Sequence, residues 1–300
     1  MNRNGLLTAV LAALVAAAGP ALEVESVLGL GNVAFDLSEN SPLSAAEESF
    51  DPLLHGFGSL TITDRINDAF DLSAGFERDP ILRNTVFTRV AFGQDYFRLT
   101  LGPVFGPFNA EGTVLNGGIS AGLRLEVPGI AFVTFRTDST IGAGLSVPGD
   151  YVQERNEVGV GFWTPNIVMT FRISSRSFTV RDTRELDIID DCTRYELIAD
   201  VYKKNVPYTA TVNLGYQALS RSYVAAADTV ADELRSAIVG IEFGVRATPV
   251  LGLMAGTEAA LYSWGVEGLG NPDANVALFT VRLGATITLP NVGFSARQAE

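Results

Sequence analysis

The feature that most restricts the fold is a strict alternation of apolar and polar side chains close to the end of the chain. In VALFTVRLGATITLP, residues 276–290, every odd position from Phe279 to Leu289 is apolar, and the even positions between them are Thr, Arg or Gly. Successive side chains of a β-strand point to opposite faces, so this segment is predicted to be a strand with one apolar and one polar face. The apolar face would meet a core in a soluble sandwich, or lipid in a membrane barrel with a polar lumen.

Alternating runs of this kind recur along the chain, whereas helical periodicity is nearly absent. About fourteen strands are predicted, with roughly twelve to sixteen possible, because short strands are easily miscounted. They are expected near residues 24–36, 55–63, 70–78, 85–93, 96–106, 117–127, 130–142, 151–163, 167–179, 194–203, 208–219, 235–247, 251–264 and 276–289. The best helical candidate, residues 41–50, falls inside a loop. The pattern indicates an all-β chain.

The predicted connections alternate between short and long. Short ones follow the even-numbered strands, at 64–69, 94–95, 128–129, 165–166, 205–207 and 249–250. Connections after the odd-numbered strands are mostly longer and more acidic, for example at 38–52, 181–193 and 224–234. This alternation, with both chain ends on the short side, is typical of outer-membrane barrels, whereas an immunoglobulin-like sandwich mixes loop lengths. The predicted fold is therefore a closed antiparallel transmembrane β-barrel, wound as an up-and-down meander.

The two faces of the predicted strands favour the barrel over the sandwich. In the strand at 235–247 one face is apolar, and the other carries Gly240, Glu242, Gly244 and Arg246. The polar face of the strand at 208–219 carries Thr209, Thr211, Asn213 and Gln217. An inner wall in contact with water explains such faces directly. A closed barrel also satisfies every backbone polar group without an open edge, which hydrocarbon demands.

The N-terminal segment has the three parts of a secretory signal peptide. Arg3 supplies positive charge, residues 6–18 are apolar, and Gly19-Pro20-Ala21 resembles a cleavage site. We therefore expect a signal peptide at 1–21, the barrel at 22–289 and a short tail at 290–300. The expected location is the outer membrane, with both termini in the periplasm. The net charge of −13 argues against a nucleic-acid partner, and the single cysteine, Cys192, allows no internal disulfide.

A short motif on the predicted last strand resembles a known assembly signal. RLGATITL, residues 282–289, is similar to the C-terminal β-signal that the outer-membrane barrel assembly machinery reads, with Arg282, Gly284, Ile287 and Leu289 at its four defined positions. The match departs from the pattern at the C-terminus, where the chain continues PNVGFSARQAE instead of ending in an aromatic residue. The resemblance implies a Gram-negative-type outer-membrane β-barrel protein, porin-like, with the assembly machinery and outer-membrane lipid as partners.

Charged residues on the predicted inner face suggest a channel. Basic residues fall near mid-strand on three strands and acidic residues on three others, and one further arginine breaks this division: Arg89, Arg136, Arg172, Asp200, Glu242, Glu258 and Arg282. Opposed basic and acidic walls resemble a porin eyelet, where focused fields discriminate between solutes by charge. The predicted function is passive diffusion of small polar or charged solutes. Replacing Arg89, Arg136 and Arg172 with Glu should then shift ion selectivity toward cations.

Two other kinds of barrel stay open at this point. The charges could pair across the lumen and close it, which would leave a surface antigen or adhesin. A hydrophobic-compound channel similar to FadL would need an N-terminal plug, but the first predicted strand starts almost directly after the expected cleavage site. No enzymatic activity is predicted, because the single histidine, His55, is better explained as a polar residue at a membrane interface than as the partner of Asp51 with Ser49 or Ser59.

Two further motifs are interpreted without a ligand, so no cofactor and no metal are expected. GLGNVA, residues 29–34, fits a loose dinucleotide-binding pattern, but no helix follows that could receive the phosphate, and strand glycines explain it better. The acidic run with Asp187, Asp190 and Asp191 lacks the glycine-containing loop of a calcium hand. It is predicted to be a solvated external loop with an exposed Cys192 beside it.

Overall fold

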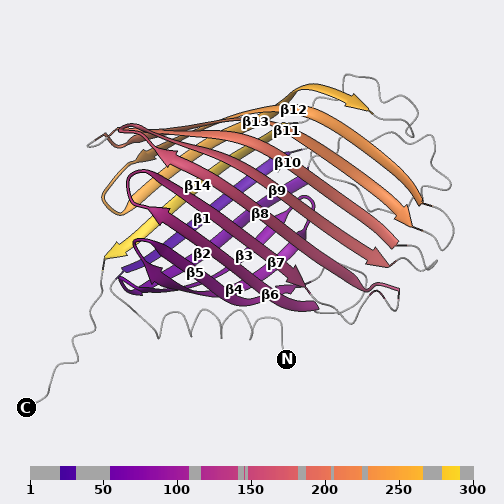
Figure 1. The fold of residues 1–300 in the computed structure, drawn as a ribbon, viewed down its shortest axis with the longest axis horizontal. Coiled ribbons are helices and arrows are strands. Elements are labelled where there is room, and N and C mark those ends of the chain that lie inside the picture. The colour runs from indigo at the N-terminus through magenta and orange to yellow at the C-terminus, as the bar shows by residue number, and fades with distance from the viewer. Residues whose placement is uncertain are drawn as a thin grey trace, which may run out of the picture.

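The structure is a computed structural model of the 300-residue chain. It describes residues 21–31, 55–107, 116–140, 145, 148–181, 187–203, 206–224, 229–265 and 279–290. Within these residues the chain forms fourteen strands that close into one barrel (Figure 1). The described residues contain no helix long and apolar enough to cross a membrane.

Each strand pairs with its neighbours in sequence, and the first strand pairs with the last. The strands are β1 (Ala21–Gly31), β2 (His55–Asn67), β3 (Phe70–Asp79), β4 (Arg83–Gln94), β5 (Phe97–Gly106), β6 (Asn116–Val127), β7 (Ala131–Thr140), β8 (Tyr151–Trp163), β9 (Ile167–Arg181), β10 (Asp187–Tyr202), β11 (Tyr208–Val224), β12 (Thr229–Arg246), β13 (Leu251–Gly265) and β14 (Phe279–Pro290). All pairings are antiparallel, and β1 closes the barrel on β14 from Ala21↔Pro290 to Gly31↔Thr280. The predicted antiparallel meander is confirmed.

The predicted strand positions agree closely with the observed ones, and the two largest differences have a common cause. β8 spans the predicted residues 151–163, but β10 begins at Asp187 instead of residue 194, and β12 begins at Thr229 instead of residue 235. Both early starts include acidic residues that read as loop. In a barrel with a polar inner face, acidic residues are compatible with a strand. The predicted segments 32–36, 41–50 and 276–278 lie outside the described residues.

Short turns gather at the barrel end where Ala21 pairs with Pro290. The Pro-Gly connection between β6 and β7 is a tight turn, in which the Ile130 N–H donates to the Val127 carbonyl at 3.0 Å. Gly129 has a φ of 74°, a conformation that glycine adopts without steric cost. The predicted contrast in length holds only in part at the opposite end. The connection between β3 and β4 spans residues 80–82, and the long connections predicted at 181–193 and 224–234 are reduced to residues 182–186 and 225–228, because β10 and β12 begin early.

The side chains are distributed in the reverse of a soluble domain. On the outer face Leu28, Phe243 and Leu283 are 69%, 58% and 62% exposed. On the inner face Glu196 and Gln217 are each only 1% exposed. Polar residues are mostly exposed in soluble proteins, so an apolar outside around a polar inside indicates a barrel that meets an apolar surrounding. This arrangement confirms the predicted faces of β11 to β14.

Candidate functional site: the barrel interior

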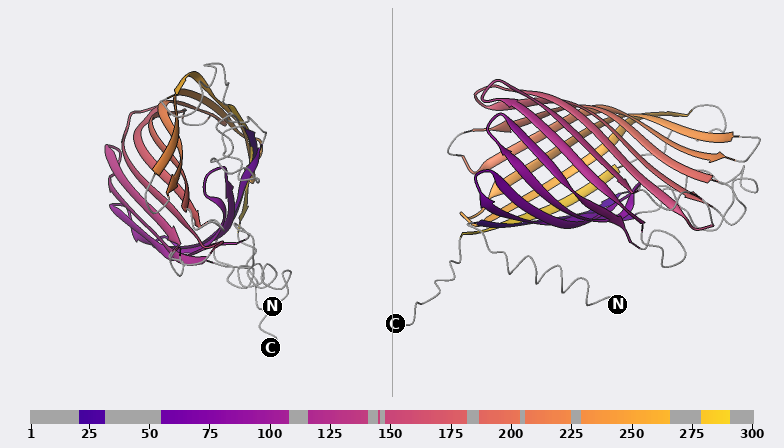
Figure 2. Two further views of the ribbon diagram at one scale, coloured as in Figure 1. Left: turned by 90° about the vertical axis from the view of Figure 1, so that its right-hand side faces the viewer. Right: turned by 60° about the horizontal axis from the view of Figure 1, so that its bottom comes forward.

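The most unusual element of the interior is the tip of the β3–β4 hairpin, residues 79–83. Asp79 caps this tip, since its Oδ1 accepts hydrogen bonds from the N–H groups of Ile81 and Leu82 at 2.8 and 3.0 Å. Ile81 and Leu82 are only 2% and 3% exposed, although they occupy a turn. Seen along the barrel in Figure 2 (left), purple strands turn into the space inside the ring. The hairpin tip is therefore packed within the barrel.

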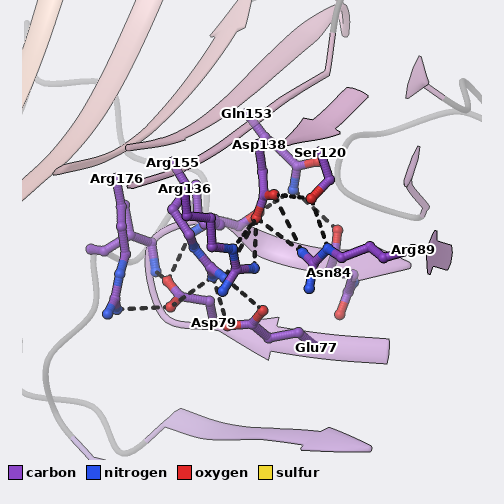
Figure 3. A network of polar contacts seen from close by, with 12 residues as sticks. Glu77, Asp79, Asn84, Arg89, Ser120, Arg136, Asp138, Gln153, Arg155 and Arg176 are labelled. Atoms are coloured by element: carbon purple, nitrogen blue, oxygen red, sulfur yellow. Dashed lines mark hydrogen bonds and ion pairs between the residues drawn. The ribbon is translucent and has the colours of Figure 1, made fainter. Parts of the chain in front are cut away.

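Two arginines from the opposite wall fasten the hairpin tip. Arg155 of β8 forms a two-pronged ion pair with Glu77 of β3, at 2.9 and 2.6 Å (Figure 3). Arg176 of β9 donates to the Asp79 carboxylate at 2.8 Å. The amide of Gln153 donates to the carbonyls of Leu82 and Asn84. Paired arginine–carboxylate contacts of this kind are geometrically specific, so they fix the tip in one position against β8 and β9.

Asp138 of β7 is the centre of a second set of contacts beside the tip (Figure 3). It accepts Arg136 at 2.6 Å, Arg89 at 3.2 Å and the Ser120 hydroxyl at 2.5 Å. The structure thus brings two of the predicted lumen arginines, Arg89 and Arg136, onto one carboxylate. Asp138 is 7% exposed, so the arginines provide the compensation that a buried charge requires.

The acidic run in β10 corrects two predictions. Asp190 was predicted to lie in a solvated loop, but it is 1% exposed and pairs with Arg221 at 2.6 Å and with Arg83 of the hairpin at 3.3 Å. Cys192 was expected to be exposed, but it is 2% exposed and free. Both errors have the same physical reason. The segment is a strand, and alternation places these two side chains on the packed inner face.

The remaining predicted lumen residues are also matched with polar partners. Glu196 accepts Arg172 at 2.8 Å, and Glu258 accepts Arg194 at 2.5 Å. Asp200 accepts the hydroxyl of Thr211 at 2.6 Å. The charges therefore interleave as pairs between strands instead of forming one basic and one acidic wall.

Glu242 and Arg282 form a pair that spans a whole strand. Glu242 of β12 and Arg282 of β14 each lie opposite Gly256 of β13, and their charged groups meet at 3.0 Å. A Cβ at Gly256 would lie 3.1 Å from Arg282 Nε and 3.2 Å from Glu242 Cβ. The missing side chain at Gly256 therefore gives the pair its room.

The prediction from sequence missed the partners of these residues. It missed the partners Asp138, Glu196 and Arg194, and also the separate pairs Glu77–Arg155 and Asp79–Arg176 at the hairpin tip. A usable signal was present, because inward side chains recur at every second position. Glu77 and Asp79, Arg136 and Asp138, and Arg194 and Glu196 are all spaced by two.

Several cavities lined by described residues lie beside these contacts. One of about 200 Å³ lies between the hairpin tip and strands β13 and β14, where Glu258, Thr280 and Arg282 line it. A larger one of about 690 Å³ lies toward the end with the short turns, lined among others by Glu23, Glu25 and Glu242. On the other side of the tip, the cavity beside Leu82 measures about 10 Å³.

Of the residues considered for catalysis, His55 and Ser59 lie within the described ranges. His55 is the first residue of β2, and Ser59 lies four residues further along the same strand, about 13 Å away at the usual rise. Ser49 and Asp51 lie outside the described residues. No cluster of three or more His, Cys, Asp or Glu side chains able to hold a metal occurs within the described ranges. Gly29 of GLGNVA lies in β1 under the ring of Phe57, as strand glycines would.

The residues of the assembly motif lie on β14 as a last strand requires. Ile287 and Leu289 are exposed on the outer face, whereas Arg282 pairs with Glu242 inside. Gly284 lies opposite Val27 of β1. Recognition of this motif by an assembly machinery stays a prediction.

Comparison with known proteins bears on the fold. No family model matches the chain, and no curated protein matches it either. Among solved structures, an outer membrane channel from Pseudomonas putida F1 is similar with 10% identity and a TM-score of 0.51, over 91% of this chain and 96% of that one.

Two other solved structures are similar at lower TM-scores. A bacterial polysaccharide outer membrane secretin has 8% identity and a TM-score of 0.47, with 90% and 98% of the two chains covered. OmpT of Vibrio cholerae has 10% identity and a TM-score of 0.41, with 90% and 96% covered. At such identities a likeness concerns the fold alone. The chain is thus similar in fold to a bacterial outer-membrane barrel.

Proposed function

We propose that the protein is an outer-membrane channel for passive diffusion of small polar or charged solutes. The observation that carries the proposal is the combination of an apolar outer face with a polar inner face that still encloses cavities of about 200 and 690 Å³. A water-filled space lined by fixed charges lets polar solutes pass and discriminates between them by charge. The ionised inner wall gives no support to a channel for hydrophobic compounds.

The same features support a location in the outer membrane. The exposed apolar side chains suit a lipid surrounding, and the fold resembles that of an outer membrane channel. The apolar run at 6–18 supports export by a signal peptide at 1–21. In the chain that would remain after cleavage, Leu22 pairs with Leu289 at the end with the short turns, which supports periplasmic termini. The β14 motif is the proposed contact with the assembly machinery.

The channel function is tested by osmotic swelling of liposomes that contain the refolded mature chain. Small polar solutes should enter and swell them, whereas protein-free liposomes of the same lipid should not. Folding is checked in parallel by heat-modifiable migration on gels. A folded, inserted barrel that gives no swelling with any small solute would contradict the proposal.

A barrel with a blocked lumen, serving as a surface antigen or adhesin, is the second candidate. The fastened hairpin tip favours it, because Arg155 and Arg176 hold Glu77 and Asp79 across the interior. In that case the inserted barrel would cause no swelling of the liposomes. The function would then have to be sought in molecules that bind the outer surface of the barrel.

A further inference from the structure

We infer that solutes cross the barrel on one side of the hairpin tip only, and that the Glu242–Arg282 pair is the charged group that selects them there. This inference rests on the proposed channel function. Its starting point is the off-centre position of the tip, which is fastened to β8 and β9 and leaves unequal space on its two sides.

The side of the tip that faces β5 to β8 is closed. Leu82, Val104 and Thr140 line the space there, and they are at most 3% exposed. The cavity of about 10 Å³ has room for about one water molecule at most. Gln153 and Arg155 fill the remaining space with hydrogen bonds to the hairpin. Among the described residues, this side therefore leaves no room for a solute larger than water.

The other side of the tip is open over a much longer distance. The cavity of about 200 Å³ reaches from Ile81 of the tip to Thr280 and Arg282 of β14. Val27 of β1 lines this cavity and also the cavity of about 690 Å³, which lies nearer the end with the short turns and is called the lower cavity. The two cavities therefore adjoin, and together they lead from the tip to the end with the short turns.

The Glu242–Arg282 pair lies where the two cavities adjoin. Arg282 lines the upper cavity and Glu242 the lower one, and the atoms of the pair are 3.0 Å apart. The side chain of Arg282 is 34% exposed and that of Glu242 is 26% exposed, whereas that of Arg155 on the closed side is 5% exposed. A solute in the open passage can therefore contact both charges directly. Arg89 on the closed side is 13% exposed, and the carboxylate of its partner Asp138 is only 9% exposed.

The route is tested by thiol accessibility in a Cys192→Ala background. Thr280→Cys places a thiol on the open side, and Thr85→Cys places one on the closed side as a matched control. A small methanethiosulfonate reagent is applied to the folded barrel in detergent, and the reaction rate is followed by mass spectrometry. The same variants are then measured in planar bilayers before and after the reagent.

The thiol at residue 280 should react on the order of tenfold faster or more, since the reagent cannot enter a space the size of one water. Its reaction should also reduce the current, while the Thr85→Cys channel should be unaffected. Ser59→Cys, on the same open side, replaces Thr280→Cys if that variant does not fold. Equal rates, or a block only through residue 85, would overturn the one-sided route while leaving the channel intact. A silent parent barrel would overturn the channel function itself.

Discussion

The two sides of the hairpin tip share one barrel but differ in what their inner walls carry. Toward β5 to β8, arginines and carboxylates interlock with the hairpin and leave a space of about 10 Å³. Toward β13, β14 and β1, the wall does not reach the hairpin, and about 200 Å³ remain open. Strand count alone therefore does not decide how much of a barrel interior is filled. A few charged side chains from two strands decide which half of it is filled.

The largest change in stability and in conductance is expected from releasing the hairpin tip. Arg155→Ala leaves Glu77 without its two-pronged partner and Asp79 with fewer charges around it. Breaking a buried pair in this way costs about 3–5 kcal/mol of unfolding free energy, and a released tip should widen the passage and raise single-channel conductance. Urea titrations and planar-bilayer recordings measure both. Arg172→Ala is the control, since Arg172 is half exposed and does not touch the tip.

An unchanged conductance in Arg155→Ala, with the barrel still folded, would mean that the tip does not limit flow. The contrast between the two sides would then have no functional meaning. A rise of equal size in Arg172→Ala would point to general loosening of the barrel instead of release of the tip.

Opposite shifts in ion selectivity are expected from the two members of the open-side pair. Arg282→Gln leaves Glu242 unpaired and should favour cations, whereas Glu242→Gln should favour anions. A single charge about 4 Å from a passing ion in water is worth about 1 kcal/mol, which is about a fivefold change in the permeability ratio. Reversal potentials in a salt gradient measure the shift. Shifts of the same sign in both variants would contradict a direct contact with the solute.

A smaller change in ion selectivity is expected from filling the gap at Gly256 that accommodates this pair. In Gly256→Val the added carbons would crowd Arg282 Nε and Glu242 Cβ, which lie 3.1 and 3.2 Å from a Cβ at this position. Overpacking of this kind costs about 1–3 kcal/mol and should separate the pair. Gly252→Val is the matched control, because a Cβ at residue 252 would meet nothing closer than 3.7 Å. The two variants are compared by urea titration and by reversal potential.

The smallest change in selectivity is expected from the closed side. Arg89→Gln removes a charge that already pairs with Asp138, and Arg136 stays on the same carboxylate. Stability should fall by about 1–3 kcal/mol, as for other buried hydrogen bonds to charged groups, while the reversal potential should stay unchanged. A shift toward cations would restore the interpretation, made from sequence, that Arg89 faces the passing solute.

The strand pattern was predictable because alternation is a local property of the sequence. β8 was predicted at its observed bounds, and the outward Ile287 and Leu289 follow from the period of two. The inward hairpin was not predictable in the same way. Pro80 between two polar stretches reads as a surface turn, and only the apolar Ile81 and Leu82 within it indicate burial.

The pairing of charges depends on register, which the sequence does not give directly. Arg155 and Glu77 come from β8 and β3, and nothing in either segment identifies the other. The Glu242–Arg282 pair needs Gly256 in the strand between them, a relation that appears only when β12, β13 and β14 are aligned. Local patterns therefore predicted which residues face inward, but not which of them meet.

The most direct test of the account is the single-channel conductance of the refolded mature chain in a planar bilayer. We predict discrete, steady openings whose reversal potential moves in opposite directions in E242Q and R282Q. A folded and inserted barrel that stays silent would contradict the channel, and openings whose selectivity ignores both substitutions would contradict the passage along β14.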